Sequence, residues 1–247
     1  MWILAIETTG PVASVALINE NCEIKEKLGE KGYNHLTSLV PMTKLLLEEN
    51  GLTPEDLTGV AASVGPGSFT GIRIGVSTAR AFGQSLGIPC LRIPTLQTFL
   101  YNSGIAKEEQ RKLLCPILDA RRDQLYGAVF YKGETVVEEN AYSLNEYLNI
   151  IANLEVDGLK VAGTSGAFFY GDGISRYSDA ITLWGKDQKT QIYFAEEEEK
   201  YQRASSGAII AKQQWDEGKQ LSYNDLLPEY MRLAEADRKL KDGTLHV

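Results

Sequence analysis

Gly65-Pro66-Gly67-Ser68-Phe69-Thr70-Gly71-Ile72-Arg73-Ile74-Gly75 is the stretch that decides the fold of this chain. It follows a short apolar run at 60–64, which predicts a buried strand, and it opens a segment at 68–86 whose length predicts a helix. Strand, glycine loop and helix form an arrangement in which backbone N–H groups at a helix N-terminus can meet an anion. No Lys follows the glycines, as it does in a P-loop, and the spacing is not the Gly-x-Gly-x-x-Gly of dinucleotide-binding loops. The stretch therefore predicts an α/β fold without either of these phosphate-binding motifs.

Small residues recur every four positions along this segment and form a ridge without large side chains: Gly67, Gly71, Gly75, Ala79 and Gly83. Each glycine inside a helix costs about 1 kcal/mol relative to alanine. The close approach of a neighbouring element offsets that cost. The neighbour is either the chain's own sheet or another chain, and we expect a helix of another chain.

Composition restricts the class of protein. The chain has 247 residues, a net charge of −8 and a pI of about 5.0, which argues against a generic nucleic-acid binder because phosphate contacts need basic surface. Cys22, Cys90 and Cys115 have no metal-like spacing and fit a reducing compartment. The start of the chain has no basic flank, and its apolar run is too short for a signal or membrane segment, so we expect a cytoplasmic protein with no membrane partner.

The pattern predicts two related α/β halves. In each, an apolar strand ends in an acid and is followed by a turn and a return strand, at 3–7 and 12–18 in the first half and at 115–119 and 125–131 in the second. Asp119 follows Glu7 by 112 positions. The same offset matches Ala16 with Ala128 and Leu17 with Val129.

The first half is the more regular one. It also predicts a strand at 23–28, a helix at 34–50 capped by Asn34, a strand at 88–93 and a short helix capped by Thr95. We expect domains at 1–105 and 106–220, with a C-terminal motif and tail at 221–247 that packs back on either domain.

The acids at strand ends are the candidates for a nucleotide cleft, because ligands collect at the carboxyl ends of strands in α/β sheets. Glu7 and Asp119 could hold a magnesium ion bound to a nucleotide, with Thr8 and the tight loop Gly171-Asp172-Gly173 beside them. Neither acid is followed by a Gly-x-Thr phosphate turn, and Arg121 would fill a phosphate pocket. A structural role for the two acids is therefore favoured, and ATP or ADP is expected to bind weakly at most.

Other catalytic groups are scarce. The two histidines, His35 and His246, are far apart, no His-x-x-x-His pair exists, and no Gly-x-Ser-x-Gly elbow is present. We expect no metal site and no catalytic residue. His35 makes either local hydrogen bonds at a helix start or a specific polar contact near the glycine loop or a partner. Arg73 and Arg80 share one helix face and are solvated, ion-paired or ligand-binding.

These residues carry a resemblance to the TsaB family, a component of the bacterial machinery that makes threonylcarbamoyladenosine in transfer RNA. The stretch at 65–75 matches the family signature residue by residue, and the segments 4–9, 118–122 and 228–232 match further motifs. Glu7 stands where the family usually has Asp, and His35-Leu36-Thr37 stands where it commonly has His-Ser-Glu. The resemblance spans nearly the whole chain and is weakest between Asn140 and Leu221.

The resemblance implies the fold shared by actin, sugar kinases and DnaK-type chaperones, with two α/β domains and a cleft between them. TsaB is similar to the catalytic protein TsaD but lacks its metal-binding histidine pair, and here residues 92–96 occupy that place without a histidine. The implied role is to pair with TsaD, with the ATPase TsaE joining, so that a threonylcarbamoyl group is transferred to adenosine in ANN-decoding tRNA. Contact with tRNA would be indirect, through the complex.

Two other classes remain open. A small-molecule kinase of the same fold would need a phosphate turn after Glu7 or Asp119, and a metallopeptidase-like enzyme would need metal ligands. Both features are missing from the sequence.

The expected partner surface combines the ridge helix with the helix at 34–50. Leu36 and Leu39 lie on the main apolar stripe of that helix, whereas Met42 and Leu45 fall off it and are expected to be exposed. Two such helices from each subunit would form a four-helix contact with TsaD, or with a second copy of this chain when TsaD is absent. The alternative is that the ridge packs on the chain's own sheet and that Met42 and Leu45 are buried.

Overall fold

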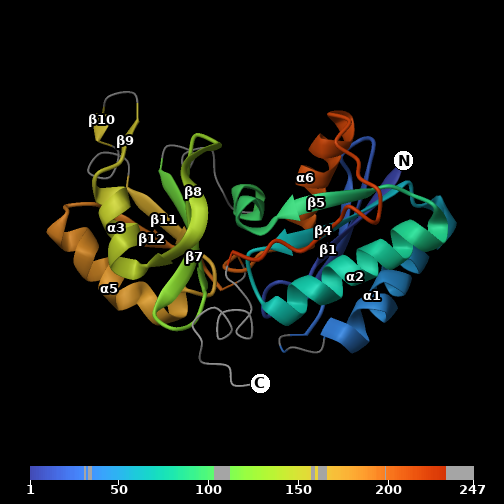
Figure 1. Cartoon of the computed structure of the whole chain (residues 1–247), viewed down its shortest axis with the longest axis horizontal. Coiled ribbons are helices and arrows are strands. Elements are labelled where there is room, and N and C mark those ends of the chain that lie inside the picture. Colours follow the sequence, from blue (N-terminus) through green and yellow to red (C-terminus); the bar gives the residue numbers. More distant parts are fainter. Residues whose placement is uncertain are drawn as a thin grey trace, which may run out of the picture.

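A computed structural model of the chain describes residues 1–30, 32, 35–102, 112–156, 159–160, 166–197 and 199–231. Asn34, the expected cap, as well as Arg232 and His246, lie outside these residues. The described part forms two lobes, each built around a five-stranded sheet (Figure 1).

The first lobe contains a mixed sheet in the order β3-β2-β1-β4-β5. Its strands are β1 (Trp2–Glu7), β2 (Ser14–Asn19), β3 (Ile24–Leu28), β4 (Gly59–Gly65) and β5 (Cys90–Pro94). The first three strands pair antiparallel, while β4 joins β1 and β5 joins β4 in parallel. This arrangement confirms the predicted strands at 23–28, 60–64 and 88–93 and places the glycine loop at the carboxyl end of β4.

Two helices cover one face of this sheet, α1 (His35–Glu49) and α2 (Phe69–Leu86). Ser68 caps α2 by accepting a hydrogen bond from the backbone N–H of Gly71, and Gly87 ends it in the left-handed conformation with φ 65°. Side chains alternate along β1, so that Leu4 and Ile6 face these helices while Ile3 and Ala5 face the opposite side. The short 3₁₀ turn η1 (Pro54–Asp56) precedes β4.

The opposite face is covered by α6 (Ala204–Asp216), which Figure 1 shows on the far side of the sheet from α1 and α2. Ala204, Ala208 and Ile210 pack there against Ile3 and Ile93. The sequence assigned residues 204–216 to the second domain, whereas the structure packs them on the first sheet. Small side chains along α6 allow this close approach.

The second lobe repeats the topology of the first, in the order β8-β7-β6-β11-β12. Its strands are β6 (Leu113–Asp119), β7 (Gln124–Tyr131), β8 (Glu134–Ser143), β11 (Ala167–Tyr170) and β12 (Ile192–Phe194). The first three again pair antiparallel and the other two in parallel. This repeat confirms the prediction of two related α/β halves.

The offset between the two halves differs between their first strands and their return strands. Ala5 pairs with Ala16, whereas its counterpart Ile117 pairs with Gly127. The match of Ala16 with Ala128, and with it that of Leu17 with Val129, is therefore wrong by one residue. The turn after Asp119 is one residue shorter than the turn after Glu7, which shifts the whole return strand.

Helices α3 (Leu144–Ala152) and α5 (Ile174–Asp187) cover one face of the second sheet, and a short hairpin of β9 (Glu155–Val156) and β10 (Leu159–Lys160) follows α3. The other face packs against η2 (Thr95–Tyr101), a 3₁₀ helix that leaves the first sheet. The N-cap of η2 is Pro94, so Thr95 is its first residue and not its cap. Leu96 and Phe99 of η2 join the lobes. Across the described ranges, no helix has both the length and the apolar character required to cross a membrane.

Candidate functional site

A cleft of about 390 Å³ lies between the two lobes. The first lobe contributes Thr9 and Gly10 from the turn after β1, and residues 67–70 from the N-terminus of α2. The second lobe contributes Asp119 and Asp172. The structure thus brings together two of the acidic residues and the glycine loop that the sequence singled out, at the carboxyl ends of β1, β4, β6 and β11.

Glu7 and Thr8 do not line this cleft. Glu7 is buried, and its Oε1 accepts hydrogen bonds from the backbone N and the Oγ1 of Thr9, both at 2.5 Å, while its Oε2 accepts one from Ser63 Oγ. Burial raises the pKa of Glu7, and the hydrogen bonds from Ser63 and Thr9 oppose that rise. Thr8 Oγ1 donates to the carbonyl oxygen of Gly71 at 2.7 Å. Both side chains are occupied inside the first lobe, so Glu7 is in no position to hold a cation in the cleft.

Asp119 and Asp172 lie together on the second wall. The backbone N–H of Asp119 donates to Asp172 Oδ1 at 2.9 Å, and the N–H of Arg121 donates to Asp119 Oδ1 at 2.8 Å. Burial raises the pKa of Asp172. The hydrogen bond from the Asp119 backbone lowers this pKa, and the negative charge of the Asp119 side chain raises it. Arg176 lies 3.7 Å from Asp119. This wall therefore carries two acidic side chains, one of which resists ionisation.

Gly171 and Gly173 have a steric role in this wall. Gly171 has φ 96°, and a Cβ there would stand 2.1 Å from the carbonyl oxygen of Ile117. A Cβ on Gly173 would meet the same oxygen at 2.9 Å. The two glycines let the loop after β11 cross the end of β6, and they offer no side chain to a nucleotide.

Gln202 is a cleft residue that the sequence did not identify. It is 3 % exposed, and its Nε2 donates to Thr9 Oγ1 at 3.0 Å, across a separation of 193 residues in the chain. Its side chain covers Gly10, where a Cβ would come within 2.6 Å of Nε2. The turn after β1 is therefore covered by a side chain from the segment that leads from the second lobe to α6.

The ridge of α2 packs on the chain's own sheet. A Cβ on Gly71 would stand 1.9 Å from the carbonyl oxygen of Thr8, and a Cβ on Gly75 would stand 2.4 Å from Thr8 Oγ1. Gly67 faces Thr9 in the same way, and Ala79 is fully buried. The prediction that a partner helix occupies this ridge is therefore wrong, because the turn after β1 already fills it.

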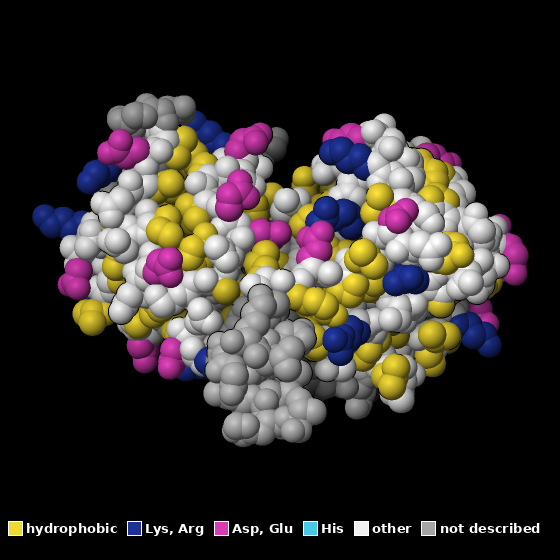
Figure 2. Space-filling view, in the orientation of Figure 1, with side chains coloured by type: hydrophobic (Ala, Val, Ile, Leu, Met, Phe, Trp, Pro, Cys, Tyr) yellow, Lys and Arg dark blue, Asp and Glu magenta, His cyan; other side chains and the backbone are white. Residues whose placement is uncertain are grey.

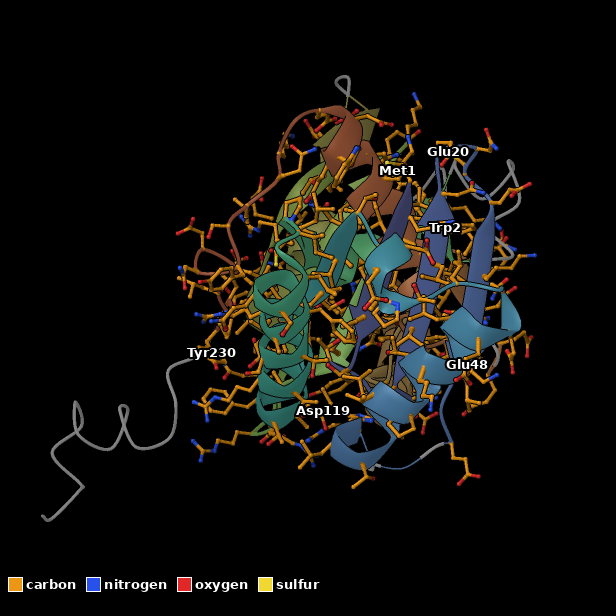
Figure 3. The ribbon with its side chains drawn as sticks, turned by 90° about the vertical axis from the view of Figure 1, so that its right-hand side faces the viewer. Met1, Trp2, Glu20, Glu48, Asp119 and Tyr230 are labelled. Carbon is orange, nitrogen blue, oxygen red and sulfur yellow. The ribbon has the colours of Figure 1, made fainter. Side chains whose placement is uncertain are left out.

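Helix α1 exposes some apolar side chains among polar ones such as Lys44 and Glu48, although not at all the predicted positions. Leu36 is 74 % exposed and Leu45 47 % exposed, whereas Leu39 and Met42 are buried in the core. The expectation of an exposed Met42 is wrong, and Leu36 lies outside the buried stripe. Val40 of α1 lines an apolar groove of about 490 Å³ together with residues of the outer side of α2, among them Ala81 and Phe82. Figure 3 shows α1 and α2 from this outer side.

His35 and Arg73 each connect distant segments. His35 is buried, and its Nε2 lies 2.9 Å from the carbonyl oxygen of Gly10, which can only accept, so this nitrogen carries the proton. Arg73 Nε donates to Tyr230 Oη at 2.9 Å, and its guanidinium stacks 4.0 Å from the ring of Phe69. His35 thus ties the start of α1 to the turn after β1, and Arg73 ties α2 to the C-terminal motif.

Comparison with known proteins identifies a matching family model and related sequences. The model of the family described as "TsaD: tRNA N6-adenosine threonylcarbamoyltransferase" matches residues 30–240. The tRNA threonylcarbamoyladenosine biosynthesis protein TsaB of Bacillus subtilis (strain 168) is 30 % identical over 244 residues, which cover 97 % of each chain. The protein of the same name from Escherichia coli (strain K12) is 27 % identical, over 97 % of this chain and 98 % of its own.

Solved structures agree on the fold. YeaZ from Pseudomonas aeruginosa has a TM-score of 0.72 at 22 % identity, covering 93 % of this chain and 99 % of its own. Component A of the (R)-2-hydroxyglutaryl-CoA dehydratase of Acidaminococcus fermentans has a TM-score of 0.50 at 10 % identity, covering 87 % and 98 %. The expected two-domain actin-like α/β fold is confirmed.

Proposed function

Because the chain belongs to the TsaB family of tRNA threonylcarbamoyladenosine biosynthesis proteins, it takes part in making that modified nucleoside, and we propose that it does so as a non-catalytic subunit. In this proposal it pairs with a TsaD-type threonylcarbamoyltransferase, and the ATPase TsaE joins the pair. Contact with tRNA runs through the complex. When TsaD is absent, the same surface pairs two copies of this chain.

The observation that carries the proposal is the outward side of α1 and α2. Leu36 and Val40, one turn apart on α1, are large exposed apolar side chains, and Val40 lines an apolar groove between α1 and α2. Leu45 is exposed on another side of the same helix. Exposed apolar area that gathers in one place marks an interaction surface. Two such helix pairs, one from each subunit, would pack as a four-helix contact. The proposed surface is therefore the outward side of α1 and α2, and it no longer includes the glycine ridge, which faces inward.

The possible metal ligands and nucleophiles of the chain support a non-catalytic role. Within the described ranges, no three His, Cys, Asp or Glu side chains lie close enough together to hold a metal ion. The described histidine, His35, is bound to the Gly10 carbonyl oxygen, and Cys90 and Cys115 are buried thiols whose pKa is raised by burial. None of these groups is placed as a nucleophile beside a base, so the chemistry is assigned to the partner.

The residues that line the cleft favour weak nucleotide binding at most. Gln202 covers Gly10 in the turn after β1, and the facing wall presents Asp119 and Asp172 together with Arg121. A phosphate group placed there would have to displace Gln202, and it would meet the carboxylate of Asp119 as well as the cation of Arg121. ATP or ADP is therefore proposed to bind weakly at this cleft or at the interface of the complex.

The test is reconstitution with TsaD and TsaE from the same source. Size-exclusion chromatography with light scattering would measure the complex, and labelled threonylcarbamoyl transfer to tRNA would measure activity. Transfer should require TsaD and rise when this chain is added. Transfer by this chain alone at the rate of the full set would contradict the proposal, and so would the absence of any complex. Sugar phosphorylation by the isolated chain would favour the kinase alternative.

A further inference from the structure

A bulge in β8 aims an acidic side chain at the first lobe. In the pairing of β7 with β8, Gly127 stands opposite Asn140 and Val129 opposite Val137, so that Glu138 and Glu139 together face the single residue Ala128. Such an extra residue in an edge strand turns side chains out of the regular alternation. The Tyr142 hydroxyl donates to the carbonyl oxygen of Glu138 at 2.7 Å and holds the bulge in place.

Glu139 reaches a cavity of about 560 Å³ at the junction of the lobes. Arg92 of β5 lines this cavity from the first lobe, and Lys219 lines it from the segment after α6. Arg92 is already paired with Glu229, whose carboxylate accepts a hydrogen bond from its Nη2. Figure 2 shows acidic and basic side chains gathered where the two lobes meet.

The charges around Glu139 do not balance. Glu229 from the C-terminal segment and Glu138 from its own strand are both acidic, and Arg92, the cation that faces them, is taken by Glu229. Lys219 is 66 % exposed at its side chain and pairs with Glu217. The other cavity residues from η2 and α6, Gln97 and Gln214, are neutral. An ionised Glu139 would therefore be partly buried beside a like charge.

We propose that Glu139 is a proton-sensitive contact between the lobes. When protonated, its neutral carboxyl group stays partly buried in the cavity beside the Arg92–Glu229 pair. When ionised, it is repelled by Glu229 and loosens that contact.

The loosening would reach the glycine loop through the C-terminal segment. The backbone N–H of Glu229 donates to the carbonyl oxygen of Val64 at 2.8 Å. The carbonyl oxygen of Glu229 lies only 2.3 Å from the position that a Cβ on Gly65 would take. The next residue, Tyr230, bonds to Arg73 of α2. A shift of Glu229 is thus felt at both ends of the loop that the sequence marks most strongly.

The sign of the effect follows from the raised pKa. Burial first, and then Glu229, raise the pKa of Glu139 from 4.5 to about 7, while Arg92 opposes that rise. The docked state therefore holds the proton more tightly than the loosened state does. Docking is favoured fully below about pH 4.5, weakens as the pH rises, and reaches its weakest level above about pH 7.

The test uses the full chain. Carbon-13 NMR of glutamate-labelled protein would titrate the side chain, with its resonance assigned by its loss in Glu139→Gln. The expected midpoint is near 7, and a midpoint near 4.5 would overturn the proposal. Hydrogen exchange of 136–142 and 219–229, corrected for the intrinsic pH dependence of exchange, should speed up about threefold or more between pH 5.5 and 8.

Matched variants separate this contact from general loosening. Glu139→Gln should keep both segments protected across the pH range, while Glu138→Gln, the neighbouring change in the same bulge, should leave the transition in place. Glu229→Gln should move the NMR midpoint downward, because it removes the like charge and releases Arg92. If Glu139→Gln shows the same speeding of exchange as the unaltered chain, or if Glu229→Gln leaves the midpoint unchanged, the proposal is overturned.

Discussion

The carbonyl oxygen of Thr8 occupies the space that a side chain on Gly71 would need, since a Cβ there would lie 1.9 Å from it. The contact is reciprocal, because Thr8 Oγ1 donates to the carbonyl oxygen of Gly71 at 2.7 Å. The turn after β1 and the first turn of α2 are thereby locked together. The glycine spacing of α2 is a requirement of this internal contact.

Gly71→Ala should lower the free energy of unfolding by about 2–3 kcal/mol, because the added methyl group cannot avoid a backbone atom. Urea denaturation monitored by circular dichroism would measure it. Gln84→Ala, an exposed change on the same helix, is the control and should have little effect. Equal stability of the two variants would show that the turn after β1 can move away.

Glu7→Gln should flatten the dependence of stability on pH. The pKa of Glu7 is raised in the folded chain, so its contribution is fully present below the unfolded value near 4.5 and is lost as the pH rises through the folded value. Gln stays neutral at every pH. The stability of Glu7→Gln relative to the unaltered chain should therefore be higher at pH 8 than at pH 5. Urea midpoints across that range would measure this, with the exposed Glu48→Gln as control. A parallel pH profile for Glu7→Gln and the unaltered chain would contradict the expectation.

The first lobe could be predicted largely from its sequence because its signals are local. Ser68 and Gly87 bound α2 by capping, and apolar runs mark β1 and β4. Helix α6 was missed because Arg203 gives no side-chain cap and its buried side chains are mostly small. Its place on the first sheet depends on contacts with β1 and β5 that no local pattern records.

The candidate site was only partly predictable for the same reason. Asp119 was identified because it ends a strand and Asp172 because it lies in the tight loop after one, and the structure places both in the cleft. Gln202 has no motif, and its role arises from a contact with Thr9 far away in the chain. The four-residue spacing of α2 indicated a close neighbour without saying which one, and the neighbour is the turn that contains Thr8.

Leu45→Asp, alone or with Leu36→Asp, should weaken association with TsaD and with a second copy of the chain by tenfold or more, about 1.4 kcal/mol or above. Both side chains are exposed, so the fold should survive. Leu183→Asp is the matched control, since Leu183 is 61 % exposed on α5 of the other lobe. Sedimentation velocity would measure the affinities. An equal loss in the Leu183 variant, or no loss in the Leu45 variant, would place the interface elsewhere.

Titration with MgATP or MgADP should give a dissociation constant on the order of 1 mM or weaker for the isolated chain. The Gln202 side chain over Gly10 covers the turn where phosphate would bind, and the carboxylate of Asp119 on the facing wall offsets the attraction of Arg121. Isothermal calorimetry would measure this, and Gln202→Ala should bind somewhat better because the turn is uncovered. Micromolar binding by the unaltered chain would contradict the proposed role of the cleft.

Tyr230→Ala should release the C-terminal motif from α2. The Tyr230 ring lies 4.4 Å from the ring of Phe69, and its hydroxyl accepts a hydrogen bond from Arg73. Figure 3 shows Tyr230 beside α2. Because Tyr230 is partly exposed, the loss of stability should be modest, about 1 kcal/mol, while hydrogen exchange at 226–231 should rise clearly. Tyr230→Phe keeps the ring and should retain most of the protection if stacking dominates. If the Phe variant loses as much protection as the Ala variant, the hydrogen bond to Arg73 is the main anchor. Unchanged exchange in both variants would mean that Glu229 alone holds the segment.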